Sequence, residues 1–114
     1  MTKSQKFYLL DLLEYIGRIE TIVSEGQDTF FNSTIYQDAV IRNFEVIGEI
    51  IKRLDPNLTA QHPHIIWADY AGFRDVLIHQ YDKVLLDIVW GSTQHDIQPL
   101  KEAVQSLLKS FSDQ

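Results

Sequence analysis

Apolar residues recur along this chain at intervals of three and four, the spacing that lines one face of an α-helix. The helices that this pattern predicts span residues 4–25, 32–54, 64–80, 86–95 and 99–111. A break is expected at 96–98, because Pro99 fits the first turn of a new helix but strains the interior of an existing one. A capping box of Thr2 and Gln5 is expected at the start of the first helix. The pattern therefore predicts an all-α, four- to five-helix up-and-down bundle with one long irregular connection, 55–63.

The two longest predicted helices each carry one apolar stripe. The stripe residues are Leu9, Leu12, Leu13, Ile16, Ile19 and Val23 in the first and Tyr36, Val40, Phe44, Ile47, Ile51 and Leu54 in the second. Gly48 interrupts the second helix, where glycine costs about 1 kcal/mol against alanine, and close packing of a neighbouring helix is the favoured reason for it. A turn at 27–29 is expected to return Phe30 and Phe31 to the core. The helix at 64–80 is apolar around much of its girth, which predicts burial on a second side by an interface.

Composition limits the class of protein. With 114 residues the chain is predicted to form a single domain, residues 1–114. The lack of cysteine excludes a disulfide framework and a cysteine-based zinc site. No apolar run is long enough to span a membrane and the first residues do not resemble a signal peptide, so a soluble cytoplasmic protein is expected. The net charge of −6 argues against broad binding to nucleic acid, DNA included, and leaves room for a local site that contacts few RNA phosphates.

One short stretch, residues 72–81, carries side chains that a packed helix does not need. Arg74 and His79 are five residues apart, which places them about 140° apart around an ideal helix, so they do not share a face. Asp75 and His79 are four residues apart and lie on the same face of the helix. Asp75 is therefore a candidate to accept a proton from the imidazole of His79 and to fix the orientation of that ring. A site that uses both Arg74 and His79 must form at a helix end or combine two copies of the chain. This geometry favours a symmetric dimer.

Arginine and histidine together supply what RNA cleavage without a metal requires. A base takes the proton of the ribose 2′-OH, an acid protonates the leaving 5′-oxygen, and a cation stabilises the phosphorane. His79 has the chemistry for both proton transfers, and the planar guanidinium of Arg74 binds two phosphate oxygens. Spacing alone favours a plainer interpretation, with a buried Arg74–Asp75 pair and a core histidine at 79. The plainer interpretation of Tyr81 is an aromatic side chain that packs at the helix end with its hydroxyl in water.

Several stretches together resemble a known family. They are residues 39–49, which include Ile47-Gly48-Glu49; residues 66–75, from Ile66-Trp67 to Arg74-Asp75; His79-Gln80-Tyr81; and residues 86–90, which end at Trp90. In these stretches the chain is similar to the HepT-like toxins of the HEPN ribonuclease superfamily, and the likeness covers nearly the whole chain. The chain departs from the family pattern at Asp75, where asparagine is commoner, and at Ile50, where a small residue is commoner.

The resemblance implies a homodimeric, HEPN-like bundle that is a metal-independent endoribonuclease. Such a protein is the toxin of a type II- or type VII-like toxin–antitoxin pair and cleaves RNA such as tRNA or mRNA, with no cofactor. Arg74 and His79 are implied as the catalytic pair and Asp75 as a supporting residue. The implied partner is a minimal nucleotidyltransferase antitoxin that silences the toxin by transferring AMP to Tyr81. An adenylyl group there adds bulk and negative charge where a substrate phosphate should sit.

Other interpretations remain beside this one. The alternative function is a non-catalytic helical dimer that binds a nucleotidyltransferase partner or a nucleotide. A bundle without any ligand ranks last, because polar residues are costly in a core. His62 and His64 are a weak candidate metal site, since no third ligand converges on them. Lys52 and Arg53 are expected to be solvated, and the sequence does not decide whether Glu49 supports the catalytic arginine.

Overall fold

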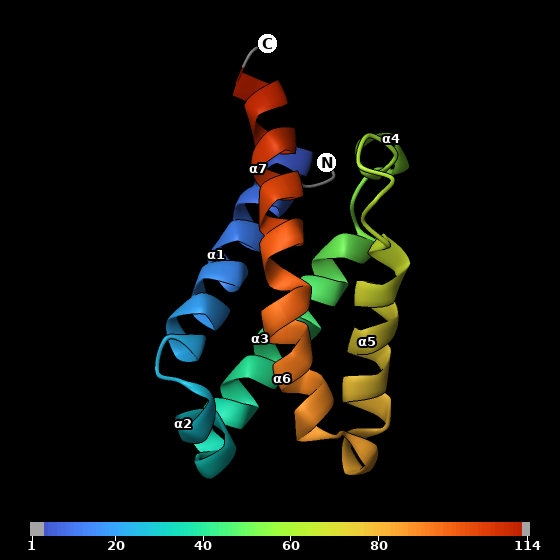
Figure 1. The fold of residues 1–114 in the computed structure, drawn as a ribbon. Helices are drawn as coiled ribbons and strands as arrows, with labels where there is room; N and C mark the ends of the chain where they lie inside the picture. The colour runs from blue at the N-terminus through green and yellow to red at the C-terminus, as the bar shows by residue number, and fades with distance from the viewer. Residues whose placement is uncertain (1–3, 113–114) are drawn as a thin grey trace.

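The structure, a computed structural model, describes residues 4–112, and these form helices with no strand among them. The elements are α1 (Gln5–Val23), α2 (Gln27–Asn32), α3 (Thr34–Lys52), α4 (Pro56–Thr59), α5 (Trp67–His79), the 3-10 helix η1 (Tyr81–Lys83), α6 (Leu86–His95) and α7 (Ile97–Ser112). Four rods run alternately down and up the bundle: α1, α3, α5, and the consecutive pair α6 and α7 (Figure 1). The predicted all-α up-and-down bundle is confirmed.

Local capping explains where the long helices begin. The hydroxyl of Ser4 accepts a hydrogen bond from the backbone at the start of α1, and that of Ser33 does the same for α3. Thr2, half of the expected capping box, lies outside the described residues. The predicted break in the last rod is confirmed at Asp96, which ends α6, and Pro99 falls in the first turn of α7.

Three predicted boundaries were wrong. Residues 27–29 belong to a short helix, α2, which Gly26 starts from a left-handed backbone conformation with φ 96°. The connection 55–63 contains one helical turn, α4, because Asp55 caps it and a proline follows at its first position. The third long helix begins at Trp67, since the backbone of Ile66 is not helical.

The core lies where α1, α3 and α7 pack together, with α7 against α1 and α1 against α3. Its buried members include Leu9, Leu12, Ile16, Ile19, Val40, Phe44, Ile47, Ile51, Leu100, Val104 and Leu107. These are most of the residues of the predicted stripes. Phe30 is also buried and packs against Trp90, which confirms the prediction that Phe30 lies in the core. No described helix is long and apolar enough to cross a membrane.

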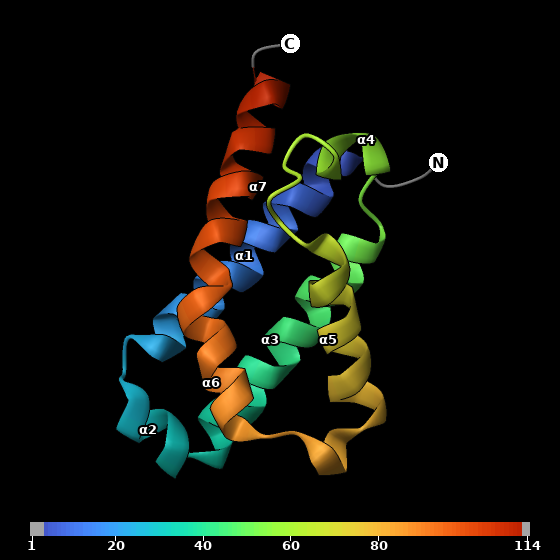
Figure 2. The same cartoon turned by 45° about the vertical axis from the view of Figure 1, so that its right-hand side comes forward.

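Helix α5 is covered mainly on one side, by α3 (Figure 2). Leu77 is its one buried residue, and the side chains of Ile66 and Val76 are exposed. The second burial that its sequence predicts is therefore not provided within one chain. Because apolar residues are left on an uncovered side, this helix is the element that a second molecule would contact.

Candidate active site

The polar motif lies in the second half of α5 and just beyond it. Arg74 and Asp75 belong to the helix, His79 is its last residue, and Tyr81 opens η1. The helix ends there because the backbone of Gln80, with φ −126° and ψ 40°, leaves the helical region. The motif thus spans a helix end.

Helices α3 and α5 approach closely at Gly48. A Cβ atom at this position would overlap the Cβ of Arg74 and lie 2.7 Å from the carbonyl oxygen of Tyr70. Glycine is required because neither of these atoms can rotate away. The predicted packing role of Gly48 is confirmed, and the contact also fixes where the arginine leaves its helix.

The guanidinium of Arg74 is held between two carboxylates. Its Nη1 donates to Oδ1 of Asp75 at 2.9 Å, and its Nε lies 3.4 Å from Oε2 of Glu49. The second contact is an ion pair without hydrogen-bond geometry, because Nε is buried and has no acceptor among the described residues. The side chain is 22% exposed. The guanidinium is therefore partly desolvated and oriented by opposite charges, while one of its N–H groups remains without an acceptor.

Two further cations join this cluster, which we call the seam network: Glu49, Lys52, Arg53, Arg74 and Asp75. Nζ of Lys52 lies 2.7 Å from Oδ1 of Asp75, and Nη2 of Arg53 lies 3.2 Å from Oε1 of Glu49. Both cations are exposed, as the sequence predicts, and each is also paired with a carboxylate. Three positive and two negative groups leave a local charge of +1 in a chain whose net charge is −6. The network is thus a local basic site.

One oxygen of Asp75, Oδ1, accepts two hydrogen bonds within the seam network. The hydrogen bond from Lys52, and after it the one from Arg74, holds the pKa of the carboxyl below its ordinary value. A carboxyl with a lowered pKa is ionised throughout the neutral range, so the network keeps its charge there. No hydrogen bond joins Asp75 to His79 in the described part of the chain, and the candidate pairing of these two residues is not observed.

His79 is exposed at the end of α5, and its imidazole makes no hydrogen bond or ion pair with another residue in the range 4–112. The interpretation as a core histidine was therefore wrong. Arg74 faces α3, whereas His79 lies on the uncovered side of the same helix, as the 140° between them requires. One chain by itself presents the two groups in different directions.

Tyr81 is 79% exposed, so it does not pack at the helix end as the plainer interpretation holds. The other four tyrosines of the chain are all partly buried. Tyr81 is consequently the most exposed tyrosine of the chain. Nearby, the side chains of Leu85 and Ile88 are 63% and 58% exposed, which makes the η1–α6 corner apolar on its surface.

The histidines at 62 and 64 do not form a larger cluster. Their rings lie 5.7 Å apart in an edge-on arrangement. Within the described residues, no group of three or more histidine, aspartate or glutamate side chains is arranged to hold a metal ion.

The ion pair of Lys52 with Asp75 was not predicted from the sequence, and the role of Glu49 was left open. One signal was present. Lys52 is four residues after Gly48, so it shares the helix face on which the packing glycine lies, and Glu49 is adjacent to that glycine. Once Gly48 is taken as the point of closest approach, both side chains are placed beside the neighbouring helix.

Comparison with known proteins gives one consistent family. The family model described as "Ribonuclease HepT-like" matches residues 12–107. A Methanocaldococcus jannaschii protein named "Gamma-glutamylcyclotransferase and putative RNase" is 40% identical over 112 residues; the match covers 97% of this chain and 50% of that protein, so the chain spans half of that relative's length. A Thermococcus cleftensis protein named "Probable ribonuclease HepT" is 37% identical over 110 residues, covering 96% of this chain and 100% of that protein. No solved structure matches.

Proposed function

Since the chain belongs to the HepT-like ribonuclease family, we propose that it is a metal-independent endoribonuclease, the toxin of a toxin–antitoxin pair, whose site is built from Arg74 and His79. It acts on RNA in the cytoplasm. The observation that carries the proposal is the state of Arg74. Its side chain is 22% exposed, and its guanidinium is oriented by the carboxylates of Glu49 and Asp75. A cation held in this way is suited to stabilise the negative charge of a phosphate.

The reaction needs two proton transfers and one charge stabiliser. His79 removes the proton of the ribose 2′-OH, and the 2′-oxygen attacks the adjacent phosphorus. The bond from phosphorus to the 5′-oxygen breaks, and that oxygen takes up a proton from an imidazolium. The products are a 2′,3′-cyclic phosphate and a 5′-hydroxyl end. Arg74 stabilises the negative charge that develops on the phosphorane, while Asp75 and Glu49 orient the guanidinium.

A second copy of the chain would complete the site. Arg74 and His79 of one chain point in different directions, so a cleft that contains both is built most simply from two chains. Exposed apolar side chains flank the motif at Val76, Leu85 and Ile88. Gly72 lies on the same uncovered side of α5, where a Cβ would meet nothing within 4 Å. A glycine inside a helix is unfavourable, and close approach by a second copy of the chain would be a reason for one at this position.

The proposal predicts that two inactive variants restore each other. Arg74→Ala and His79→Ala proteins are each expected to cleave RNA in EDTA at least about 10²-fold more slowly than wild type, because each lacks one of the two required groups. When they are mixed and their subunits exchange, a heterodimer retains one Arg74 and one His79, and cleavage should return. The measurement is the cleavage rate of end-labelled RNA and of tRNA, with 5′-hydroxyl ends identified in the product.

The controls separate the possible failures of this experiment. Light scattering must show a dimer, and intact mass must show that Tyr81 is unmodified. If the mixture stays inactive while wild type cleaves, Arg74 and His79 act within one chain. If wild type cleaves only with a divalent metal, the mechanism is wrong. If the unmodified wild-type dimer does not cleave at all, the alternative of a non-catalytic dimer that binds a nucleotidyltransferase or a nucleotide replaces the nuclease.

We propose further that a minimal nucleotidyltransferase silences the toxin by modifying Tyr81. In that step the phenol oxygen attacks the α-phosphorus of ATP, pyrophosphate leaves, and the phenol proton passes to a base of the transferase. The exposure of Tyr81, 79%, supports the assignment, since the other tyrosines are partly buried. The adduct would place a phosphate two residues from His79, where it repels the RNA backbone.

Co-incubation with ATP and the nucleotidyltransferase encoded beside the gene should increase the mass of the wild-type chain by one adenylyl group, on Tyr81. Tyr81→Phe should remove that modification, because it deletes only the accepting oxygen. Tyr36→Phe is the matched control, and its mass should increase as that of wild type does. Peptide mass spectrometry checks the position. Modification of Tyr81→Phe at an unchanged rate would contradict the assignment.

A further inference from the structure

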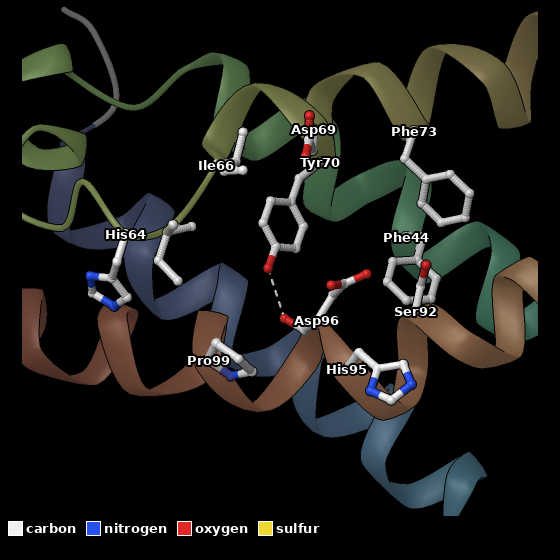
Figure 3. A pocket seen from close by; sticks show the side chains of 11 residues that line it. Phe44, His64, Ile66, Asp69, Tyr70, Phe73, Ser92, His95, Asp96 and Pro99 are labelled. Atoms are coloured by element: carbon white, nitrogen blue, oxygen red, sulfur yellow. Dashed lines mark hydrogen bonds between the residues drawn. The ribbon is translucent and has the colours of Figure 1, made fainter.

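A second candidate site lies where α5 faces the junction of α6 and α7. A cavity of about 410 Å³ opens between these helices, with Phe44 of α3 on its inner side (Figure 3). None of Arg74, Asp75, His79 or Tyr81 lines it. Its volume is within the range of about 300–1,000 Å³ that small-molecule pockets occupy. The cavity is thus separate from the proposed nuclease site.

Aromatic rings form the walls of this cavity. Phe44 and Phe73 meet edge to face with their ring centres 5.3 Å apart. The ring of Tyr70 stands beside them, and its hydroxyl donates a hydrogen bond of 2.8 Å to the backbone carbonyl of Asp96 (Figure 3). That bond ties α5 to the break between α6 and α7.

The rim of the cavity is negatively charged. Asp69 of α5 and Asp96 at the helix break both line it, and no lysine or arginine does. The pKa of Tyr70 is raised to about 12, mainly because the side chain is partly buried. The negative charges of Asp96 and Asp69 raise this pKa further. The rings of His64 and His95 complete the rim. A phosphate is disfavoured here, whereas a cation is attracted by the carboxylates and by the aromatic faces.

We propose that this cavity binds a small organic cation, namely a linear aliphatic amine of the polyamine class. The methylene chain would lie along Phe44, Tyr70 and Phe73, and the ammonium groups would lie at Asp69 and Asp96. An acidic rim above aromatic walls suits this chemistry because it supplies hydrogen-bond acceptors and ring faces but no cation to bind an anion. The inference does not depend on the nuclease activity.

Spermidine is the probe, titrated into the 114-residue chain at low salt and followed by calorimetry and amide NMR. Saturable binding should shift the amides of residues 64–73 and 92–99 selectively. Asp69→Asn and Asp96→Asn should each weaken binding by about two- to fivefold, since each removes one contact between exposed charges. Asp38→Asn is the matched control, because it makes the same charge change at an exposed position outside the cavity. It should bind spermidine as wild type does.

Three results would overturn the proposal. Absence of saturable binding would show that the cavity does not take this ligand. Equal weakening by all three aspartate variants, with shifts spread over the surface, would show diffuse attraction to an acidic protein. Shifts of the same amides by adenosine, a neutral probe, at equal or higher affinity would show that the cavity selects a base and not a cation. Thermal melts of each variant verify that it is folded before it is titrated.

Discussion

Replacing His79 with alanine is expected to slow RNA cleavage in EDTA by about 10²–10⁴-fold, the usual contribution of a general acid–base group. The fold should persist, because the imidazole is exposed and makes no hydrogen bond with another described residue. The free energy of unfolding should therefore change by no more than about 0.5 kcal/mol. The initial cleavage rate and a denaturant melt of the same preparation measure the two quantities.

A second histidine provides the matched control for this variant. His62→Ala removes an imidazole but keeps the backbone carbonyl of residue 62, which accepts a hydrogen bond from the indole of Trp67. Its cleavage rate should equal that of wild type. A loss of several kcal/mol in His79→Ala would mean that His79 supports the fold, and an undiminished rate would mean that another group performs the proton transfers.

The fold was predictable from sequence because its long helices bury simple stripes. Leu9, Leu12, Ile16 and Ile19 follow helical spacing, and all four are buried as predicted. The short helices were not predictable in the same way. The single turn of α4 depends on its cap at Asp55 and not on a repeated apolar spacing, so local hydrogen bonding decides it.

The candidate site was predictable in its residue types but not in its pairings. The helical angle between Arg74 and His79 already indicated that one chain would present them separately. The ion pair between Arg74 and Glu49 could not be predicted from helical angles, because the two residues belong to different helices and come together only when α3 and α5 pack. The aromatic cavity has the same origin, since Phe44, Tyr70 and Asp96 come from three parts of the chain.

Gly48→Ala is expected to destabilise the protein and to inactivate it. Alanine favours a helix by up to about 1 kcal/mol over glycine, which would stabilise α3 taken alone. The new methyl group, however, would overlap the Cβ of Arg74 and lie 2.7 Å from the carbonyl of Tyr70, so α5 must move away. Overpacking of this kind costs about 1–3 kcal/mol, and we expect a net loss of about 1–2 kcal/mol. The displacement also moves the guanidinium relative to Glu49.

Gly17→Ala separates this packing effect from helix propensity. Gly17 lies inside α1, and a Cβ there would meet nothing within 4 Å. The substitution should raise the free energy of unfolding by up to about 1 kcal/mol and leave cleavage unchanged. If Gly17→Ala raises the free energy of unfolding and Gly48→Ala lowers it, the α3–α5 contact is the cause of the difference. Gly48→Ala should also lose cleavage activity by more than about tenfold, because Arg74 is displaced. If both variants were stabilised equally, the close approach at Gly48 would not govern the position of the arginine.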